Sequence, residues 1–461
     1  MERREHRIGP VGVSENTHWG DTGDARETRW GYSPFLCLSA GGQHPRGAKH
    51  PVCLYAAWPP APVSSSGKET MNNKCLQVRR VIGLDAHPTL FSAAAVAGPD
   101  ALQARVEWVV DRVPLERLEN VLKKRVAAGE PIALEAGGNS FAVAKRLAAV
   151  GLQAVVLESQ AVGKVGKAYC ATDKVDAVKI GRVYLSGLAH EVWRPDGPAA
   201  ERRELFFGDR NAVRDAVRAR NRIWAFLNQQ CVRRPSGLRL GGPQALDELL
   251  KLRAWTPMQQ FLLKEEVDAF QVAEGRRHRL RTEIAAAVAE DPQVLRLIRL
   301  LGVRAKVAFA LSAFIGPIER FANPKKLVAY FGLNPCVSRS GISGGNGGLA
   351  QYGRGDVRAL LIQAAQSILR HGQGPTHRWA LALKMRKGAN IAVAALARKL
   401  VVSIWYLMQG LFTQLPEATA HLKIKIHKIA SEIGRPRLRA MGYASGREFE
   451  EKKIEELLRI C

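Results

Sequence analysis

Four carboxylates in the first half of the sequence have the types and spacing that metal-dependent chemistry on phosphate esters needs. Asp85 and Glu135 each end a short apolar run, and Glu135 stands just before a glycine turn. Asp173 and Asp176 are three residues apart, which places both on one face of a helix or in its first turn. Carboxylate oxygens suit Mg²⁺ (or Mn²⁺), and such ions activate a nucleophile and stabilise a leaving oxygen at a phosphodiester.

Each acid also has a purely structural interpretation. An Asp at a strand end caps a turn, and an Asp near the start of a helix caps its free backbone N–H groups. Ligands of open α/β sheets lie beyond the carboxyl ends of the strands, which favours a site at Asp85 and Glu135. The alternative is that the acids are unrelated surface carboxylates.

A second group of candidate residues surrounds a glycine-rich segment at residues 340–355, where the sequence predicts a loop. Ser340 precedes Gly341, which has no side chain, so the bulky backbone of a substrate can approach the serine closely. Three nearby arginines are candidates for holding phosphate charge: Arg339, Arg354 and Arg358. No G-x-x-x-x-G-K-[ST] pattern occurs, which argues against an NTPase. The alternative is a flexible loop before a helix, with no chemistry.

A further turn also suggests phosphate contact. Gly302-Val303-Arg304 follows an apolar segment that is expected to be helical. The three residues resemble half of a helix-hairpin-helix phosphate-binding turn, although the usual second glycine is absent.

The elements that position these residues change in kind along the chain. Short β-rich runs alternate with helical stretches over residues 78–195, which predicts an α/β layer fold. Its strands are expected at residues 81–84, 92–96, 106–110, 132–134 and 154–157. Residues 200–290 predict a basic antiparallel coiled-coil arm, whose second helix is expected over 246–289. Residues 291–415 are expected to be mostly helical, and 416–461 form a carboxyl-terminal tail.

The first 70 residues lack this patterning. They are rich in Gly, Pro and Ser and show neither strand nor helix periodicity. The patterned sequence begins just after Met71, so residues 1–70 are interpreted as a disordered leader or as the product of a misassigned start codon.

Cysteine usage and hydropathy suggest a reducing cytoplasm. The seven cysteines form no C-x-x-C pair, which argues against a zinc ribbon and a disulfide framework. The longest apolar stretch is interrupted by Arg398 and Lys399, so no membrane span or membrane partner is expected.

The charge favours a nucleic-acid partner. Lys and Arg number 69 against 42 Asp and Glu, a formal charge of +27, and 46 of the basic residues are Arg. The planar guanidinium suits bidentate contact with phosphate. Residues 201–240 hold ten Arg against four acidic residues. A membrane surface is the weaker alternative.

Taken in order, these motifs resemble a known family over about residues 78–412. The quoted segments are Val-Ile-Gly-Leu-Asp85, Leu-Glu135-Ala, Thr-Asp173-x-x-Asp176-Ala, Phe-Gly332-Leu-Asn-Pro335, Ser340-Gly341 and Arg358-Ala-Leu-Leu. Together they resemble the DEDD insertion-sequence transposases related to the Piv/MooV invertases. The resemblance implies an α/β RuvC-like (RNase H-like) domain, a coiled-coil arm and a mostly helical transposase domain.

The resemblance also implies a chemistry and partners. Asp85, Glu135, Asp173 and Asp176 would bind metal, and Ser340 would attack DNA to form a covalent phosphoserine linkage. Ser338 and Ser343 are rival nucleophiles. The partners would be element ends and target DNA, a structured bridge RNA encoded by the element, and further copies of the chain, at the nucleoid in a bacterial cytoplasm. Two alternatives stay open: a RuvC-like nuclease that uses water, and a non-catalytic nucleic-acid-binding scaffold.

Overall fold

The computed structural model describes residues 80–165, 173–195, 197–340, 343–350, 352–411 and 419–459. The leader expected at residues 1–70 lies outside these residues.

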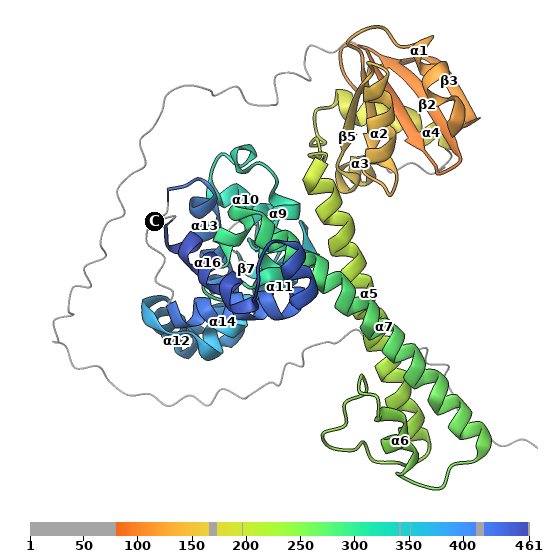
Figure 1. The fold of residues 1–461 in the computed structure, drawn as a ribbon. Coiled ribbons are helices and arrows are strands. Elements are labelled where there is room, and N and C mark those ends of the chain that lie inside the picture. The colour runs from red at the N-terminus through yellow and green to blue at the C-terminus, as the bar shows by residue number, and fades with distance from the viewer. Residues whose placement is uncertain are drawn as a thin grey trace, which may run out of the picture. The chain divides into compact units, whose positions relative to one another are not determined.

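The amino-terminal part of the described chain is built on a five-stranded sheet (Figure 1). Its strands are β1 (Arg80–Ala86), β2 (Leu90–Ala97), β3 (Arg105–Pro114), β4 (Pro131–Glu135) and β5 (Gln153–Leu157), in the order β3-β2-β1-β4-β5. The first three strands form an antiparallel meander, whereas β1, β4 and β5 run parallel. The five predicted strands all lie within these bounds, and the mixed α/β prediction for this region is confirmed.

Helices cover both faces of the sheet. They are α1 (Leu118–Lys123), preceded by the 3-10 turn η3 (Leu115–Arg117), α2 (Ser140–Ala149), α3 (Ser159–Val165) and α4 (Asp173–Leu185). Successive strand residues point to opposite faces. Ile82 packs with Leu122 of α1 and Val143 of α2, whereas Val81 packs with Ile180 of α4. Burial on both faces explains why the central strands are almost continuously apolar.

Helix α4 crosses strand β1 at Gly83. A Cβ at this position would lie 1.9 Å from the carbonyl oxygen of Ala177 and 2.6 Å from the amide nitrogen of Gly181. Only glycine allows the helix backbone to approach the strand this closely. The contact holds Asp176, the neighbour of Ala177, near the carboxyl end of β1.

Two long helices follow the sheet: α5 (Gly197–Gln229) and α7 (Pro257–Glu290) (Figure 1). They run antiparallel, because Arg222 pairs with Glu266 at 2.7 Å while Asp215, earlier in α5, pairs with Arg276, later in α7, at 3.8 Å. At 1.5 Å per residue each helix is about 50 Å long.

The second half of this helix pair differs from the sequence prediction. One helix was expected over 246–289, but a short α6 (Ala245–Leu250) ends well before α7 begins. Thr256 and Gln259 form a reciprocal capping box, and Pro257 occupies the first helical position. These residues satisfy the free N–H groups of a new helix, so they fix a helix start inside the predicted tract.

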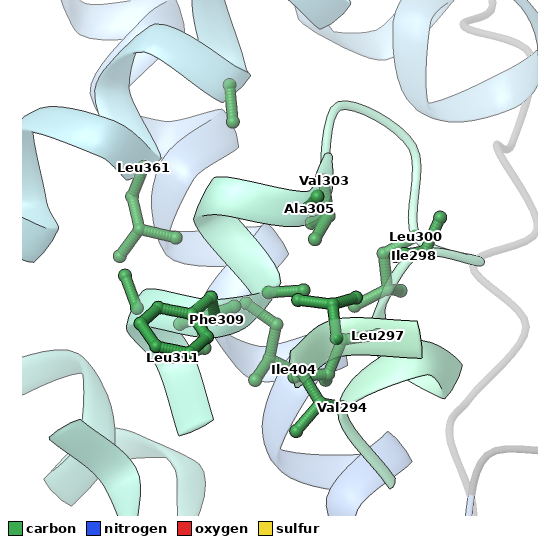
Figure 2. Close-up of a cluster of buried hydrophobic side chains, with 14 of the residues drawn as sticks. Val294, Leu297, Ile298, Leu300, Val303, Ala305, Phe309, Leu311, Leu361 and Ile404 are labelled. Carbon is green, nitrogen blue, oxygen red and sulfur yellow. The ribbon is translucent and has the colours of Figure 1, made fainter. Parts of the chain in front are cut away.

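The remaining described helices share one hydrophobic core. They are α8 (Pro292–Leu297), α9 (Ala305–Ile315), α10 (Pro324–Tyr330), α11 (Gly355–His371), α12 (Gly374–Lys387), α13 (Ala389–Met408), α14 (Thr419–Ile433), α15 (Arg435–Ala440) and α16 (Gly446–Arg459), with a 3-10 turn η4 (Ile318–Arg320). Figure 2 shows Phe309, Leu361 and Ile404 meeting in this core. The mostly helical prediction is confirmed. Leu422 of α14 and Phe449 of α16 lie in the same core, so the expected tail is packed.

The glycine-rich segment is a hairpin, and the prediction of a loop was wrong. Strands β6 (Pro335–Ser340) and β7 (Ser343–Leu349) pair antiparallel. A strand of this composition has no apolar alternation to reveal it, because the backbone ladder, which is independent of side chains, makes the pairing.

Helix α13 is long and apolar enough to cross a membrane by length and composition, with a mean hydropathy of 1.7, despite Arg398 and Lys399. It is the only such helix among the residues described. Leu396, Leu400 and Ile404 of this helix are buried in the shared core.

Candidate active site

Three of the four candidate acids gather at one edge of the sheet. Leu84 and Leu134 are register partners in the parallel strands β1 and β4, so Asp85 and Glu135 follow at the same carboxyl end. Both residues are half-buried. Asp176 reaches them from α4, which lies on β1 at Gly83.

The pKa of the Glu135 carboxyl reflects the proximity of the other acids. Burial raises the pKa of the Glu135 carboxyl above its usual range. Lys179 acts in the opposite direction, and the negative charges of Asp85 and Asp176 raise the pKa further. Burial and like charges both disfavour the ionised carboxyl, so a cation at this edge would be stabilised.

Lys179 is a member of the site that the sequence interpretation missed. Its Nζ lies 3.5 Å from Oδ1 of Asp176, one helical turn away on α4. The three-residue spacing from Asp176 is the sequence signal that identifies such a partner. The lysine supplies positive charge beside the carboxylates when no metal does.

The donor set fits a hard divalent cation in chemistry. Asp85, Glu135 and Asp176 offer carboxylate oxygens within electrostatic reach of one another. Within the described ranges, no three acidic, His or Cys side chains already stand at metal-ligand spacing. Asp173 begins α4, and its side chain lies outside the described part of the structure. The metal role of these acids stays a prediction.

The second candidate region is the β6–β7 hairpin. Ser340 pairs with Ser343 at the end of the ladder, and Ser338 pairs with Gly345 two residues earlier. The hairpin therefore brings all three candidate serines to its outer half. Their side chains, and that of Arg339, lie outside the described part of the structure.

Two glycines close the base of the hairpin. Gly332 has φ +66°, and a Cβ there would lie 2.1 Å from the carbonyl oxygen of Tyr352. Gly353 has φ +86°, and its Cβ would lie 2.6 Å from the carbonyl oxygen of Tyr330. The chain segments before and after the hairpin thus cross in backbone contact. Ala350 N donates to Asn334 O at 2.8 Å across this crossing.

Arg358 of α11 ties this crossing together. Its Nη1 donates to the carbonyl oxygens of Ala350 at 2.6 Å and of Gly332 and Tyr352 at 3.2 Å. The acceptors come from both sides of the hairpin. One nitrogen of Arg358, which was predicted to hold phosphate, therefore donates its hydrogen bonds to the protein backbone. A phosphate contact by this side chain stays a prediction.

Arg354 lies at the same base. Its Nη2 donates to Oδ2 of Asp356 at 2.8 Å, and its guanidinium lies 4.3 Å from the ring centroid of Phe314. Its Nε is buried and has no hydrogen-bond partner. Arg354 is thus placed beside the hairpin with part of its donor capacity unused.

The carboxyl-half region matches a known family. Residues 295–380, which include the hairpin, α9 and α11, match the family model described as "Transposase IS116/IS110/IS902 family". The matched span contains the candidate serines and none of the four acids.

The chain is also similar to individual proteins that are described as transposases. The chain is 31% identical over 150 residues to a "Probable family 20 transposase" of Pseudomonas aeruginosa, covering 32% of this chain and 44% of that one. It is 33% identical over 129 residues to the "Transposase for insertion sequence element IS1111A" of Coxiella burnetii, covering 27% and 35%. A "Putative transposase y4rJ" of Sinorhizobium fredii is 27% identical over 300 residues, covering 59% and 75%. The chain thus spans less than half the length of the first two relatives.

Proposed function

We propose that this protein is a DNA transposase of an insertion sequence, which cuts and rejoins DNA through metal-bound acids and a serine nucleophile. The observation that carries the proposal is the match of residues 295–380 to a transposase family. The carboxylates that gather at one sheet edge support it, and so does the formal charge of +27.

The sheet supports a RuvC-like (RNase H-like) assignment for the first domain. An antiparallel meander continues into parallel strands, and the acids follow the carboxyl ends of two adjacent strands. With Asp173, these residues form the DEDD set: Asp85, Glu135, Asp173 and Asp176. They would hold Mg²⁺ or Mn²⁺, which supplies charge neutralisation at the reacting phosphate.

In the proposed reaction, Ser340 Oγ attacks the phosphorus of one DNA strand. The Oγ–P bond forms as the bond from phosphorus to the leaving strand oxygen breaks, and the serine proton ends on that oxygen. The phosphoserine ester retains the energy of the broken bond, so a second strand hydroxyl can reverse the step to rejoin DNA. Arg339, Arg354 and Arg358 are the proposed phosphate contacts.

We further propose a structured RNA as the guide, on the strength of the family resemblance. Arm residues 201–240, with ten arginines, are a candidate surface for nucleic acid or a second subunit. Joining two DNA ends requires more than one site, so a homo-oligomer is proposed. The place of action would be the bacterial cytoplasm, at the nucleoid.

Trapping of the covalent intermediate tests the mechanism. The full chain is incubated with Mg²⁺ and DNA that carries the element ends, and denaturing gels detect protein-linked DNA. Ser340→Ala should abolish the linkage, while Ser338→Ala and Ser343→Ala are the matched controls that retain it. A linkage that persists in Ser340→Ala removes that serine from the nucleophile role.

The acid edge alone favours a second candidate, a RuvC-like nuclease with water as the nucleophile. Its carboxylates belong to one sheet and its covering helix, with no contribution from the hairpin. Cleaved ends that carry no protein, made equally by Ser340→Ala, would establish this candidate. Salt-sensitive binding without either product would leave only a scaffold.

A further inference from the structure

A basic cavity lies among the helices of the carboxyl-terminal core, and its lining includes none of the candidate acids or serines. Its volume is about 490 Å³, within the range of ligand-binding pockets. The walls come from α7, the α8–α9 turn, the end of α11, and α14. Ile284, Val303, Ile368 and Ile429 of these elements belong to one hydrophobic core, so the cavity is part of a packed unit.

The cavity concentrates positive charge. Five Lys and Arg side chains line it against one acid, Glu432. The five are Arg281, Arg304, Lys306, Lys425 and Lys428. Two histidines, His371 and His421, complete the polar lining.

Some of these cations are already engaged by the protein. Lys306 Nζ donates to the fully buried carboxylate of Asp209. Lys425 Nζ donates to the carbonyl oxygens of Ile298 and Leu300 at 2.7 and 2.8 Å, which stabilises the turn that leads to Gly302. These two lysines shape the cavity wall. Lys428 Nζ lies 3.8 Å from Oε1 of Glu432, the one acid of the lining, in a partly exposed pair on α14.

The arginines are different. Across the described residues, neither Arg281 nor Arg304 has an ion pair or a side-chain hydrogen bond. Arg304 is exposed and stands at the N-cap of α9, whose first N–H groups receive no side-chain cap. Free guanidinium groups and an uncapped helix start both favour an anion at the same wall.

The Gly302-Val303-Arg304 turn packs closely against α11. Gly302 has φ +76°, and a Cβ there would lie 2.9 Å from the carbonyl oxygen of Ala364. The Gly302-Val303-Arg304 turn singled out from the sequence is therefore held against α11 at the cavity wall. Gly302, Arg304 and Ala305 line the cavity.

Apolar side chains share the lining of the cavity, and this decides the kind of ligand. Ile284, Leu301, Ile368, Ile424 and Ile429 line it. The backbone of a duplex requires only a basic surface, whereas a hollow that is partly lined by apolar side chains accommodates an unpaired base. Imidazoles such as those of His371 and His421 also stack on unpaired bases.

We propose that this cavity binds one unpaired nucleotide of a nucleic-acid strand. Arg304, Arg281 and Lys428 hold its phosphate, and the base packs against the apolar part of the lining. The inference extends the proposed function, because it gives the enzyme a strand anchor separate from the reacting phosphate. Arg358 and His371 are 13 positions apart on α11, so the anchor lies about 20 Å from the hairpin base. Along a duplex axis this distance corresponds to about six base pairs at 3.4 Å each.

Binding of short oligonucleotides tests the proposal without any catalysis. Fluorescence anisotropy is measured with the full chain in EDTA, using a labelled thymidine 12-mer, a uridine 12-mer and a 12-base-pair duplex. Arg304→Ala and Lys428→Ala should each weaken binding of a single strand about five- to ten-fold. The slope of log K against log salt should fall by about 0.7 for each phosphate-binding cation that is removed. The more strongly affected strand, DNA or RNA, identifies the natural ligand.

Matched variants separate the cavity from general electrostatics. Lys423→Ala removes the same charge from α14 outside the cavity and should change affinity less than two-fold. Arg304→Lys should retain most of the affinity. Ser367→Phe fills the cavity without a change in charge and should weaken single strands but not the duplex. Equal losses in Lys423→Ala and Lys428→Ala, or equal losses on duplex and single strand, would overturn the proposal.

Failure of the proposed chemistry can be distinguished from failure of the cavity proposal. Asp85→Asn and Ser340→Ala should abolish DNA attachment and leave oligonucleotide affinity unchanged. Normal attachment with no effect of the cavity variants on binding would refute the cavity and retain the transposase.

Discussion

Removal of the Arg358 side chain should loosen the serine hairpin without unfolding the protein. This arginine joins carbonyl groups on both sides of the hairpin, at Gly332, Ala350 and Tyr352. It projects from α11, which is anchored in the core by Val357 and Leu361. Arg358→Ala should therefore free the base of β6 and β7 while the helical core stays folded.

The size of the effect follows from the geometry. The bond to Ala350 O, at 2.6 Å, is short, and hydrogen bonds to charged groups contribute about 1.5–3 kcal/mol. The two contacts at 3.2 Å are weaker. A net loss of about 2 kcal/mol corresponds to a roughly 30-fold larger opening equilibrium for the hairpin. Arg358→Lys should give a smaller effect of the same sign, since the ammonium keeps the charge and the donors but lacks the planar guanidinium that places Nη1 against the carbonyls.

Hydrogen–deuterium exchange measures this opening directly. Peptides over residues 330–354 should exchange about 30-fold faster in Arg358→Ala, with the amides of Ala350 and Arg354 as the most informative probes. Arg370→Ala is the matched control, because Arg370 is an exposed arginine at the far end of the same helix. Formation of the protein–DNA linkage should fall in parallel with the loosened hairpin.

Two results would refute the reasoning. Unchanged exchange over residues 330–354 in Arg358→Ala would show that the three carbonyl contacts do not hold the hairpin. Equal acceleration in Arg370→Ala would show that α11 as a whole, and not the clamp, controls opening.

Three further predictions concern the scaffold and the acid edge. Gly83→Ala places a Cβ 1.9 Å from Ala177 O, so denaturant unfolding should show a loss of about 3 kcal/mol or more. Gly163→Ala, in open space within α3, should instead stabilise the protein by up to about 1 kcal/mol. Thr256→Ala removes the capping box of α7 and should cost about 1 kcal/mol in the same assay. The raised pKa of Glu135 means that metal-free stability falls as pH rises from about 4.3 through the folded-state pKa. Glu135→Gln lacks this pH-dependent loss of stability. At pH 7 thermal unfolding should show that the variant is more stable than the parent by at most about 1 kcal/mol, and the difference should vanish below pH 4. A variant less stable than the parent at pH 7 contradicts the assignment.

Local pattern was sufficient for the elements with strong apolar periodicity. The strands of the sheet lie where the apolar runs predict them, because burial on both faces leaves a continuous hydrophobic signal. The break at Thr256 was missed, since a capping box overrides helical periodicity over a few residues. The β6–β7 hairpin was missed because backbone pairing, and no side-chain pattern, holds its glycine-rich strands.

The sequence by itself determined the candidate chemistry: carboxylates at strand ends, a serine among glycines, and a charge suited to nucleic acid. Only the tertiary structure decided which of these residues lie close together. Register between β1 and β4 sets Asp85 beside Glu135, and the bare backbone of Gly83 lets α4 bring Asp176 and Lys179 to them. The basic cavity draws residues from position 281 to 432. Helix packing joins positions that far apart in sequence, and no local periodicity encodes which ones converge.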